Sequence, residues 1–301
     1  MNVQSKLILQ ILLMTSIVSF TNIAGKAAVN EIGPFAIVYF RWLIAWFTLW
    51  LILKYRGKSI SLPKSDWPLL IGLMLCGVLL NQLFFMTGLK FTVPSHPSLF
   101  YATTSIWVLL IGTLTRSGDG FNQRMILAAI LSVGGVALVL GKYLFQWQAD
   151  MLKGDAILFL AVLMWASYTA FGKKAVQKYG ALESTFIFLT IASLLYTPVG
   201  IWRLSMLPWD AISLKAWSGV LYMGIFTSGI GYILYYNVLR HLRPSQLGIM
   251  TSLQPPMTIF FSVIFGYEKI EWNLLAGTAL VIGAVFTAQK SSISQSKIRS
   301  T

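Results

Sequence analysis

Polar side chains at helical spacing within apolar runs are the first residues that could do chemistry. One set shares a single helix face at positions i, i+4, i+7 and i+11: Thr15, Ser19, Asn22 and Lys26. In a bilayer such groups are costly unless they face a cavity or a neighbouring helix. Ser19 and Asn22 are candidate substrate ligands, Asn22 the stronger because its amide has two donors and an acceptor to satisfy. For Thr15, hydrogen bonding between helices is an equally good interpretation.

Aromatic and amide side chains supply a second group of candidates. Trp165, Tyr168 and Gly172 share one face of a later helix, and Trp165 is about eleven residues into its apolar run. An interfacial anchor would lie at the end of the run, so this depth favours a cavity wall, with packing or lipid contact as the alternatives. The remaining candidates are Gln82, Tyr101, Tyr232, Thr251 and Gln254. Buried amides and phenols that converge on one point suit a small polar metabolite.

Three further residues are interpreted as structural or gating residues. The planar guanidinium of Arg41 could meet a substrate carboxylate, or it could form a structural or gating pair with backbone carbonyls. Pro255 removes a hydrogen bond from its helix, and either frees carbonyls toward a cavity or, as we favour, only kinks the helix. Glu268 lies at the end of an apolar run and is expected to mark its boundary.

The elements that position these side chains must be membrane-spanning helices. The 301 residues are 56% hydrophobic and 11% charged, with a mean hydropathy of +0.73, whereas soluble domains carry about 25% charged residues. About 20 apolar residues cross a bilayer. The sequence contains ten such runs, at 6–26, 33–54, 67–88, 95–115, 123–142, 154–174, 182–202, 216–238, 245–266 and 272–289. We therefore predict an all-α integral membrane protein with ten transmembrane helices.

The two halves of the chain repeat one pattern. Residues 19–28 read SFTNIAGKAA and residues 167–176 read SYTAFGKKAV, and a similar offset places Trp67 on Trp217. Each copy holds five spans, and because five is odd the second copy must be inverted relative to the first. Inverted repeats with a site between them near the bilayer midplane are typical of secondary transporters.

The expected organisation is a first five-helix repeat over residues 1–143, an inverted repeat over 144–290 and a basic cytoplasmic tail over 291–301. Of the 23 Lys and Arg residues, 15 lie on the side of the two termini and 7 on the other. Lys and Arg accumulate on the cytoplasmic side of membrane proteins. We therefore expect a multi-pass protein of a bacterial-type inner (plasma) membrane with both termini cytoplasmic.

Several classes of function are disfavoured by the same composition. The net charge of +14 is divided among short loops between apolar runs, which fits anionic headgroups better than nucleic acid. Cys76 is the only cysteine, and His96 and His241 are far apart in sequence, so neither a disulfide nor a metal site is expected. Clustered acids, histidines or a nucleophile with its base are not evident. We therefore expect no enzyme activity and no cofactor.

Motifs in the second half resemble those of one family. The segment from Trp165 to Lys173 is similar to the Trp-small-x-x-x-x-x-x-Lys opening of an EamA domain. The closing Pro…Gly-x-Glu…Gly pattern is more specific and is represented by Pro255, Gly266, Glu268 and Gly277. The chain resembles the ten-span EamA branch of the drug/metabolite transporter superfamily over essentially its whole length. This resemblance implies a carrier that works by alternating access.

The sequence also departs from the family pattern. Val18-Ser19 stands where the family often has Trp-Gly, and the first copy has no counterpart of Glu268. Small multidrug relatives depend on a carboxylate within their first helix, whereas all nine acidic residues here are expected at or near span ends. This difference argues against a proton/cation antiporter built on a buried acid.

The function that these observations favour is a secondary carrier that exports small metabolites, foremost amino acids and among them aromatic ones. Two alternatives stay open: efflux of organic cations or drugs, and a membrane receptor or scaffold without transport. The expected partners are a small-molecule substrate and the lipid bilayer. A monomer is favoured over a dimer.

Overall fold

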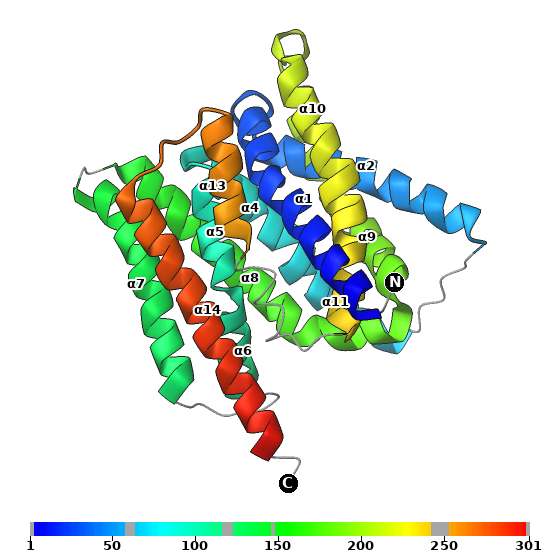
Figure 1. Ribbon diagram of the computed structural model, residues 1–301. Coiled ribbons are helices and arrows are strands. Elements are labelled where there is room, and N and C mark those ends of the chain that lie inside the picture. Colours follow the sequence, from blue (N-terminus) through cyan, green and yellow to red (C-terminus); the bar gives the residue numbers. More distant parts are fainter. Residues whose placement is uncertain (1–2, 58–63, 116–122, 146–147, 242–252, 299–301) are drawn as a thin grey trace.

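The computed structural model describes residues 3–57, 64–115, 123–145, 148–241 and 253–298, and within these ranges it contains helices and connections but no strand (Figure 1). The α-helices are α1 (Val3–Ile32), α2 (Pro34–Tyr55), α3 (Trp67–Met74), α4 (Asn81–Phe91), α5 (Ser95–Ala102), α6 (Thr104–Leu114), α7 (Gln123–Phe145), α8 (Ala149–Tyr179), α9 (Ala181–Ser205), α10 (Leu214–Tyr222), α11 (Tyr232–His241), α13 (Gln254–Ile264) and α14 (Trp272–Ile298). Two π-helices, η2 (Leu75–Leu80) and η4 (Met223–Gly231), join α3 to α4 and α10 to α11.

The predicted membrane spans correspond to these helices. Seven segments of the described chain are long and apolar enough to cross a membrane: Leu9–Ile32, Pro34–Tyr55, Trp67–Phe91, Ser95–Leu114, Ala149–Gly172, Ala181–Ser205 and Leu214–Val238. The fifth and tenth predicted runs contain the shorter apolar segments Ile126–Val139 and Trp272–Ala284. The ninth run begins outside the described residues, and α13 is its described part. The all-α membrane fold expected from the sequence is confirmed.

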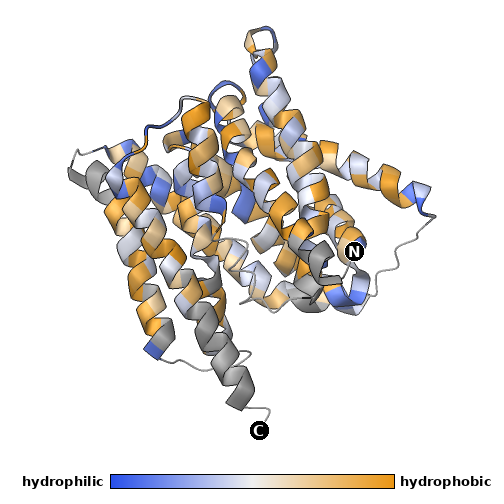
Figure 2. Ribbon diagram, in the orientation of Figure 1, coloured by the Kyte–Doolittle hydropathy of each residue, from blue (hydrophilic) through white to orange (hydrophobic). Residues whose placement is uncertain are grey.

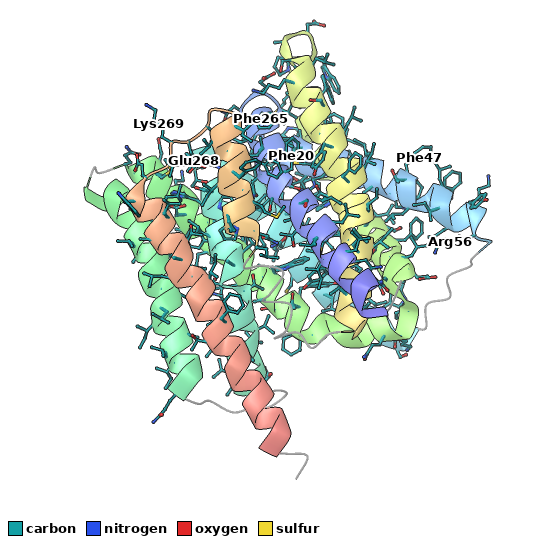
Figure 3. All side chains as sticks on the ribbon, viewed as in Figure 1. Phe20, Phe47, Arg56, Phe265, Glu268 and Lys269 are labelled. Atoms are coloured by element: carbon teal, nitrogen blue, oxygen red, sulfur yellow. The ribbon has the colours of Figure 1, made fainter. Side chains whose placement is uncertain are left out.

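Large apolar side chains on the outside of the bundle indicate where lipid would lie. Figure 2 shows apolar residues along the lengths of the helices and polar residues concentrated at helix ends and connections. Phe47 on α2, Leu194 on α9 and Phe260 on α13 are all exposed, and Figure 3 shows Phe47 on the outward side of α2. Large apolar side chains of soluble proteins are mostly buried, so their exposure on several helices suits contact with lipid.

The two repeats are interleaved rather than set side by side. The first span of each half packs against the third span of the other, α1 on α10 and α8 on α4, whereas the remaining spans pack against their counterparts: α2 on α9, α5 on α13, and α7 on α14. Figure 1 shows α7 and α14 side by side. A Cβ added to Gly135 on α7 would lie 2.8 Å from the carbonyl oxygen of Gly277 on α14, and one added to Gly277 would lie 2.6 Å from the carbonyl oxygen of Gly135. The glycines therefore allow the two backbones to touch.

The π-helices η2 and η4 occupy equivalent positions in the two repeats. Each interrupts a long span just before a polar or aromatic residue, Asn81 in the first repeat and Tyr232 in the second. Glycines make room for neighbours there, since a Cβ on Gly77 would overlap Tyr168 and one on Gly224 would overlap Ile44. π-Bulges inside α-helices are frequent at functional sites. The sequence repeat thus reappears as a structural repeat.

Polar contacts tie the repeats together at both sides of the bundle. Glu31, at the end of α1, accepts hydrogen bonds from the backbone N–H (2.7 Å) and the hydroxyl (2.9 Å) of Ser213 before α10. Asp66, before α3, accepts hydrogen bonds from Lys178 and Tyr179 at the end of α8. One chain crossing separates Glu31 from Asp66, so the two contacts lie on opposite sides. Each joins a first span to the third span of the other repeat.

Candidate functional site

A cavity of about 80 Å³ lies between the two repeats. It is bounded by residues of α1, α2, α4, α5, α8, η4, α11 and α13. A water molecule needs roughly 10–15 Å³ by this kind of measure, so several would fit. Ligand pockets usually measure about 300–1,000 Å³, so a metabolite requires helices or side chains to move apart. The cavity is therefore too small for a metabolite in this conformation.

Most of the predicted substrate-binding residues meet at this cavity. Those that line it are Asn22, Gln82, Tyr101, Trp165, Tyr232 and Gln254, and Arg41 lines it as well. Ser19 and Tyr168 are buried but do not line it. Thr251 lies outside the described residues. These six predicted residues come from six different helices and meet at one cavity.

The amides of α4 form the polar wall of the cavity. Asn81 donates to the Tyr101 hydroxyl (2.6 Å) and to the carbonyl of Ala161 on α8 (2.9 Å). Gln82 donates to the side-chain oxygen of Asn81 at 2.7 Å, and its own Oε1 has no hydrogen-bond partner among the described residues. A buried acceptor without a partner is destabilising unless a ligand or water supplies a donor.

Helix α1 contributes side chains that bond to α13 and to η4. Asn22 donates to the Thr258 hydroxyl (3.2 Å), and Ser19 donates to the backbone carbonyl of Gln254 (3.4 Å). Thr21 shares a 2.7 Å hydrogen bond with Thr227. Asn22 therefore both lines the cavity and holds helices together. Ser19 has the interhelical role alone.

Arg41 differs from the expectation that it would pair with backbone carbonyls. The side chain is only 1% exposed, and its Nε donates to the hydroxyl of Ser228 on η4 at 2.9 Å. Nη1 has no hydrogen-bond partner among the described residues. The guanidinium lies close enough to Tyr101 and Tyr232 to interact with them electrostatically. A buried cation therefore stands at the wall of the cavity.

Aromatic rings also line the cavity. Trp165 is 9% exposed, and its ring centroid lies 4.9 Å from that of Tyr235 and 6.1 Å from that of Tyr232. Behind it, 5.4 Å away, the ring of Tyr168 packs against Gly77. Trp165 is thus a wall residue, as predicted, and Tyr168 supports it from behind.

Pro255 and Glu268 are the other two residues interpreted from the sequence as structural or gating residues. Pro255 lies in the first turn of α13, where a missing N–H is harmless; the part of the ninth run that a kink would join to α13 lies outside the described residues. Glu268 accepts hydrogen bonds from the Ser95 N–H (3.1 Å) and hydroxyl (2.5 Å), and from the Ser262 hydroxyl (2.5 Å). Figure 3 shows it between α13 and α14, where it links the second repeat to the start of α5. It is more than a boundary residue.

Sequence reasoning missed a buried pair formed by His96 and Asp155. The Nδ1 atom of His96 on α5 lies 2.7 Å from the Oδ1 atom of Asp155 on α8, and both side chains are buried. Asp155 lies near a span end, as expected of the acidic residues, and nothing in the sequence around it indicates that it is buried. The two partners are 59 residues apart in the sequence, so no local pattern predicts that they pair. The pair joins the two repeats beside the Gly88–Gly154 contact of α4 and α8.

These features define the class of protein. A helical membrane bundle of two inverted repeats, with a cavity between them lined by residues of both, is the architecture of a secondary transporter. The chain belongs to the EamA-like transporter family of the drug/metabolite transporter superfamily, whose sequence profile matches residues 5–141 and 152–288. It is therefore a membrane transporter.

Relatives of similar length support this assignment. A protein of Archaeoglobus fulgidus described as an uncharacterized transporter is 25% identical over 288 residues, covering 95% of this chain and 97% of that protein. The uncharacterized transporter YetK of Bacillus subtilis (strain 168) is 26% identical over 277 residues, covering 90% and 83%. A crystal structure with 16% sequence identity superposes with a TM-score of 0.68 over 96% of this chain and 98% of the other, which shows a shared fold.

Proposed function

We propose that this transporter exports small zwitterionic metabolites, foremost amino acids and among them aromatic ones, by alternating access. The proposal places it as a monomer in a bacterial-type inner membrane, with both termini in the cytoplasm. The observation that carries it is the composition of the cavity wall. Amides and a guanidinium line it together with aromatic rings.

The polar and the aromatic side chains of the cavity complement the two parts of an amino acid. The Gln82 Oε1 atom and the Arg41 Nη1 atom are an acceptor and a donor without hydrogen-bond partners among the described residues, which suits an ammonium and a carboxylate. The rings of Trp165 and Phe85 offer apolar area for a side chain. An amphipathic cavity with a few polar groups that orient the ligand is typical of small-molecule sites.

The paired contacts at the two sides of the bundle support alternating access. Opening one side requires the Glu31–Ser213 contact to separate, and opening the other requires the Asp66–Lys178 contact to separate. Inverted repeats give the two movements equivalent geometry. The described residues that line the cavity include no Asp or Glu, so we expect substrate exchange to proceed without a proton gradient.

Counterflow in proteoliposomes tests the proposal. Vesicles loaded with unlabelled phenylalanine, at equal internal and external pH, should take up external labelled phenylalanine and show a transient overshoot. Gln82→Ala should lower this uptake, whereas Ser218→Ala, on the exposed surface of α10, should not. Uptake equal to that of protein-free vesicles for all twenty amino acids, with folded protein, would sink the proposal.

The two alternatives predict different results in the same assay. An organic-cation transporter should exchange a labelled quaternary ammonium compound, but the buried guanidinium of Arg41 repels a cation in this cavity. A receptor or scaffold should bind phenylalanine without counterflow. The amino-acid proposal requires both binding and counterflow.

A further inference from the structure

We infer that Arg41 binds the carboxylate of the substrate, so that the cavity selects carboxylates over the corresponding amides and amines. This inference rests on the proposed function and deepens it, because it assigns a chemical group of the substrate to one side chain. It starts from a charge that the described part of the chain does not balance.

The guanidinium of Arg41 is buried and incompletely paired. Its side chain is 1% exposed, its Nε donates to the neutral hydroxyl of Ser228, and its Nη1 has no hydrogen-bond partner among the described residues. A buried charge is strongly destabilising unless an opposite charge and hydrogen bonds compensate it. A structural arginine would normally have a carboxylate or several carbonyls around it.

The acidic residues near the bundle interior are paired with residues other than Arg41. Asp155 pairs with His96, Glu268 accepts hydrogen bonds from two serines, and Glu31 holds Ser213. None of the three lines the cavity. The compensating negative charge for Arg41 must therefore be brought in, and a substrate carboxylate is the group whose planar geometry matches a guanidinium.

The orientation of Arg41 suits this role. The hydrogen bond from Nε to Ser228 fixes the plane of the guanidinium and leaves the terminal nitrogen Nη1 for a ligand. Gln82 lines the same cavity, and its Oε1 atom is an acceptor without a hydrogen-bond partner among the described residues. Residues with a donor for a carboxylate and an acceptor for an ammonium thus line one cavity, and Tyr101 and Tyr232 lie beside the guanidinium.

Competition with wild-type protein tests the inference without any mutation. In phenylalanine counterflow, unlabelled phenylalanine should inhibit about 10- to 100-fold more strongly than phenylalaninamide, the difference expected for hydrogen bonds to a charged group. Phenethylamine should be as weak as the amide. If no amino acid gives counterflow, the proposed function itself fails. If counterflow occurs and acid and amide inhibit equally, only the inference is overturned.

Three variants assign the selectivity to Arg41. Arg41→Gln should abolish the preference for phenylalanine over phenylalaninamide, and Arg41→Lys, which keeps the charge, should retain part of it. Ser228→Ala removes the hydrogen bond that orients the guanidinium, so it should weaken the preference without abolishing it. Ser218→Ala, on the exposed surface of α10, is the control and should keep the full preference. The same ratios can be read from ligand-induced shifts in melting temperature, which need no transport. Full preference in folded Arg41→Gln, or its loss in Ser218→Ala, contradicts the inference.

Discussion

Gly77 gives Tyr168 the space that it occupies behind the cavity wall. A Cβ at this position would lie 2.2 Å from the Tyr168 ring, closer than the protein can accommodate without moving the ring or η2. Gly77→Ala should therefore destabilise the protein by about 1–3 kcal/mol or more, the usual effect of overpacking. Thermal unfolding in detergent measures the change.

Gly72 is the control for this prediction. It lies in α3, where a methyl group added at its Cα would have nothing within 4 Å, so Gly72→Ala should stabilise the helix by about 0.5–1 kcal/mol. Equal melting temperatures for the two alanine variants would show that Tyr168 does not depend on the space at Gly77.

The sequence predicts which residues lie near the cavity better than it predicts where their side chains point. Asn22, Gln82 and Trp165 line the cavity as expected from helical spacing. Ser19 and Tyr168 share faces with Asn22 and Trp165 along the sequence, yet they point into helix contacts. A polar residue one turn away from the cavity satisfies its hydroxyl on a neighbouring backbone, and the sequence of a single helix does not contain that neighbour.

Among the helices, the His96–Asp155 pair should fasten α5 to α8. His96→Ala would leave a buried carboxylate without its partner, and removing one member of a buried pair costs about 3–5 kcal/mol. Adding Asp155→Asn removes the orphaned charge and should recover part of the loss. Unfolding of the wild type, both single variants and the double variant measures this coupling. Additive losses would show that the two side chains do not act together.

The contact between the start of α3 and the end of α8 should depend on pH. Lys178, and then Tyr179, donate to the Asp66 carboxylate and lower the pKa of that group, while Asp66 raises the pKa of Lys178. The contribution of Asp66 is therefore complete above its ordinary pKa of about 4 and is lost as pH falls through its lowered native value. The stabilising contribution of Lys178 is complete below about pH 10 and is lost as pH rises through the raised pKa of Lys178 in the native state.

Lys178→Gln separates this contact from general acid denaturation. The wild type should melt at a higher temperature than the variant at pH 6. The difference should shrink as pH falls below about 4, where Asp66 of the unfolded chain takes up a proton, and continue to shrink through the lowered native pKa of Asp66. Lys215→Gln, at an exposed position on α10, should show no such trend. If the difference in melting temperature between wild type and Lys178→Gln were the same at about pH 3 as at about pH 6, Asp66 would not pair with Lys178.

The helices themselves were accessible from the sequence, because apolar runs of membrane length are a strong signal. The π-helices η2 and η4 were not, since nothing in the local composition separates them from α-helix. They depend on the neighbours that Gly77 and Gly224 admit, Tyr168 and Ile44, which come from other spans. The contacts of Glu31 with Ser213 and of Glu268 with Ser95 likewise depend on serines more than 170 residues away.

For the molecule as a whole, we expect both termini to face the cytoplasm. Cysteines introduced as Arg56→Cys and Lys178→Cys in a Cys76→Ala background should react with an impermeant maleimide only after permeabilisation. Asp210→Cys, before α10, should react in intact cells. All three positions are exposed, and the Asp66–Lys178 contact places the first two on one side. Labelling of Arg56→Cys and Lys178→Cys from different sides would contradict the inverted topology.

Trp165 offers the sharpest test of substrate binding in the cavity between the repeats. Trp165→Ala removes a large apolar wall, so the Kd for labelled phenylalanine should rise about 10- to 100-fold, the equivalent of burying one large side chain. Trp165→Phe keeps a ring and should lose less. Trp217, which stacks on Trp209 outside the cavity (6.0 Å between centroids), is the matched control.

The deciding measurement is equilibrium binding of phenylalanine to purified wild-type, Trp165→Ala and Trp217→Ala proteins, each checked by its melting temperature. We expect a weakened Kd with a modest loss of stability for Trp165→Ala. For Trp217→Ala we expect a lower melting temperature with an unchanged Kd. A folded Trp165→Ala protein that binds phenylalanine with the wild-type Kd would contradict substrate binding in this cavity.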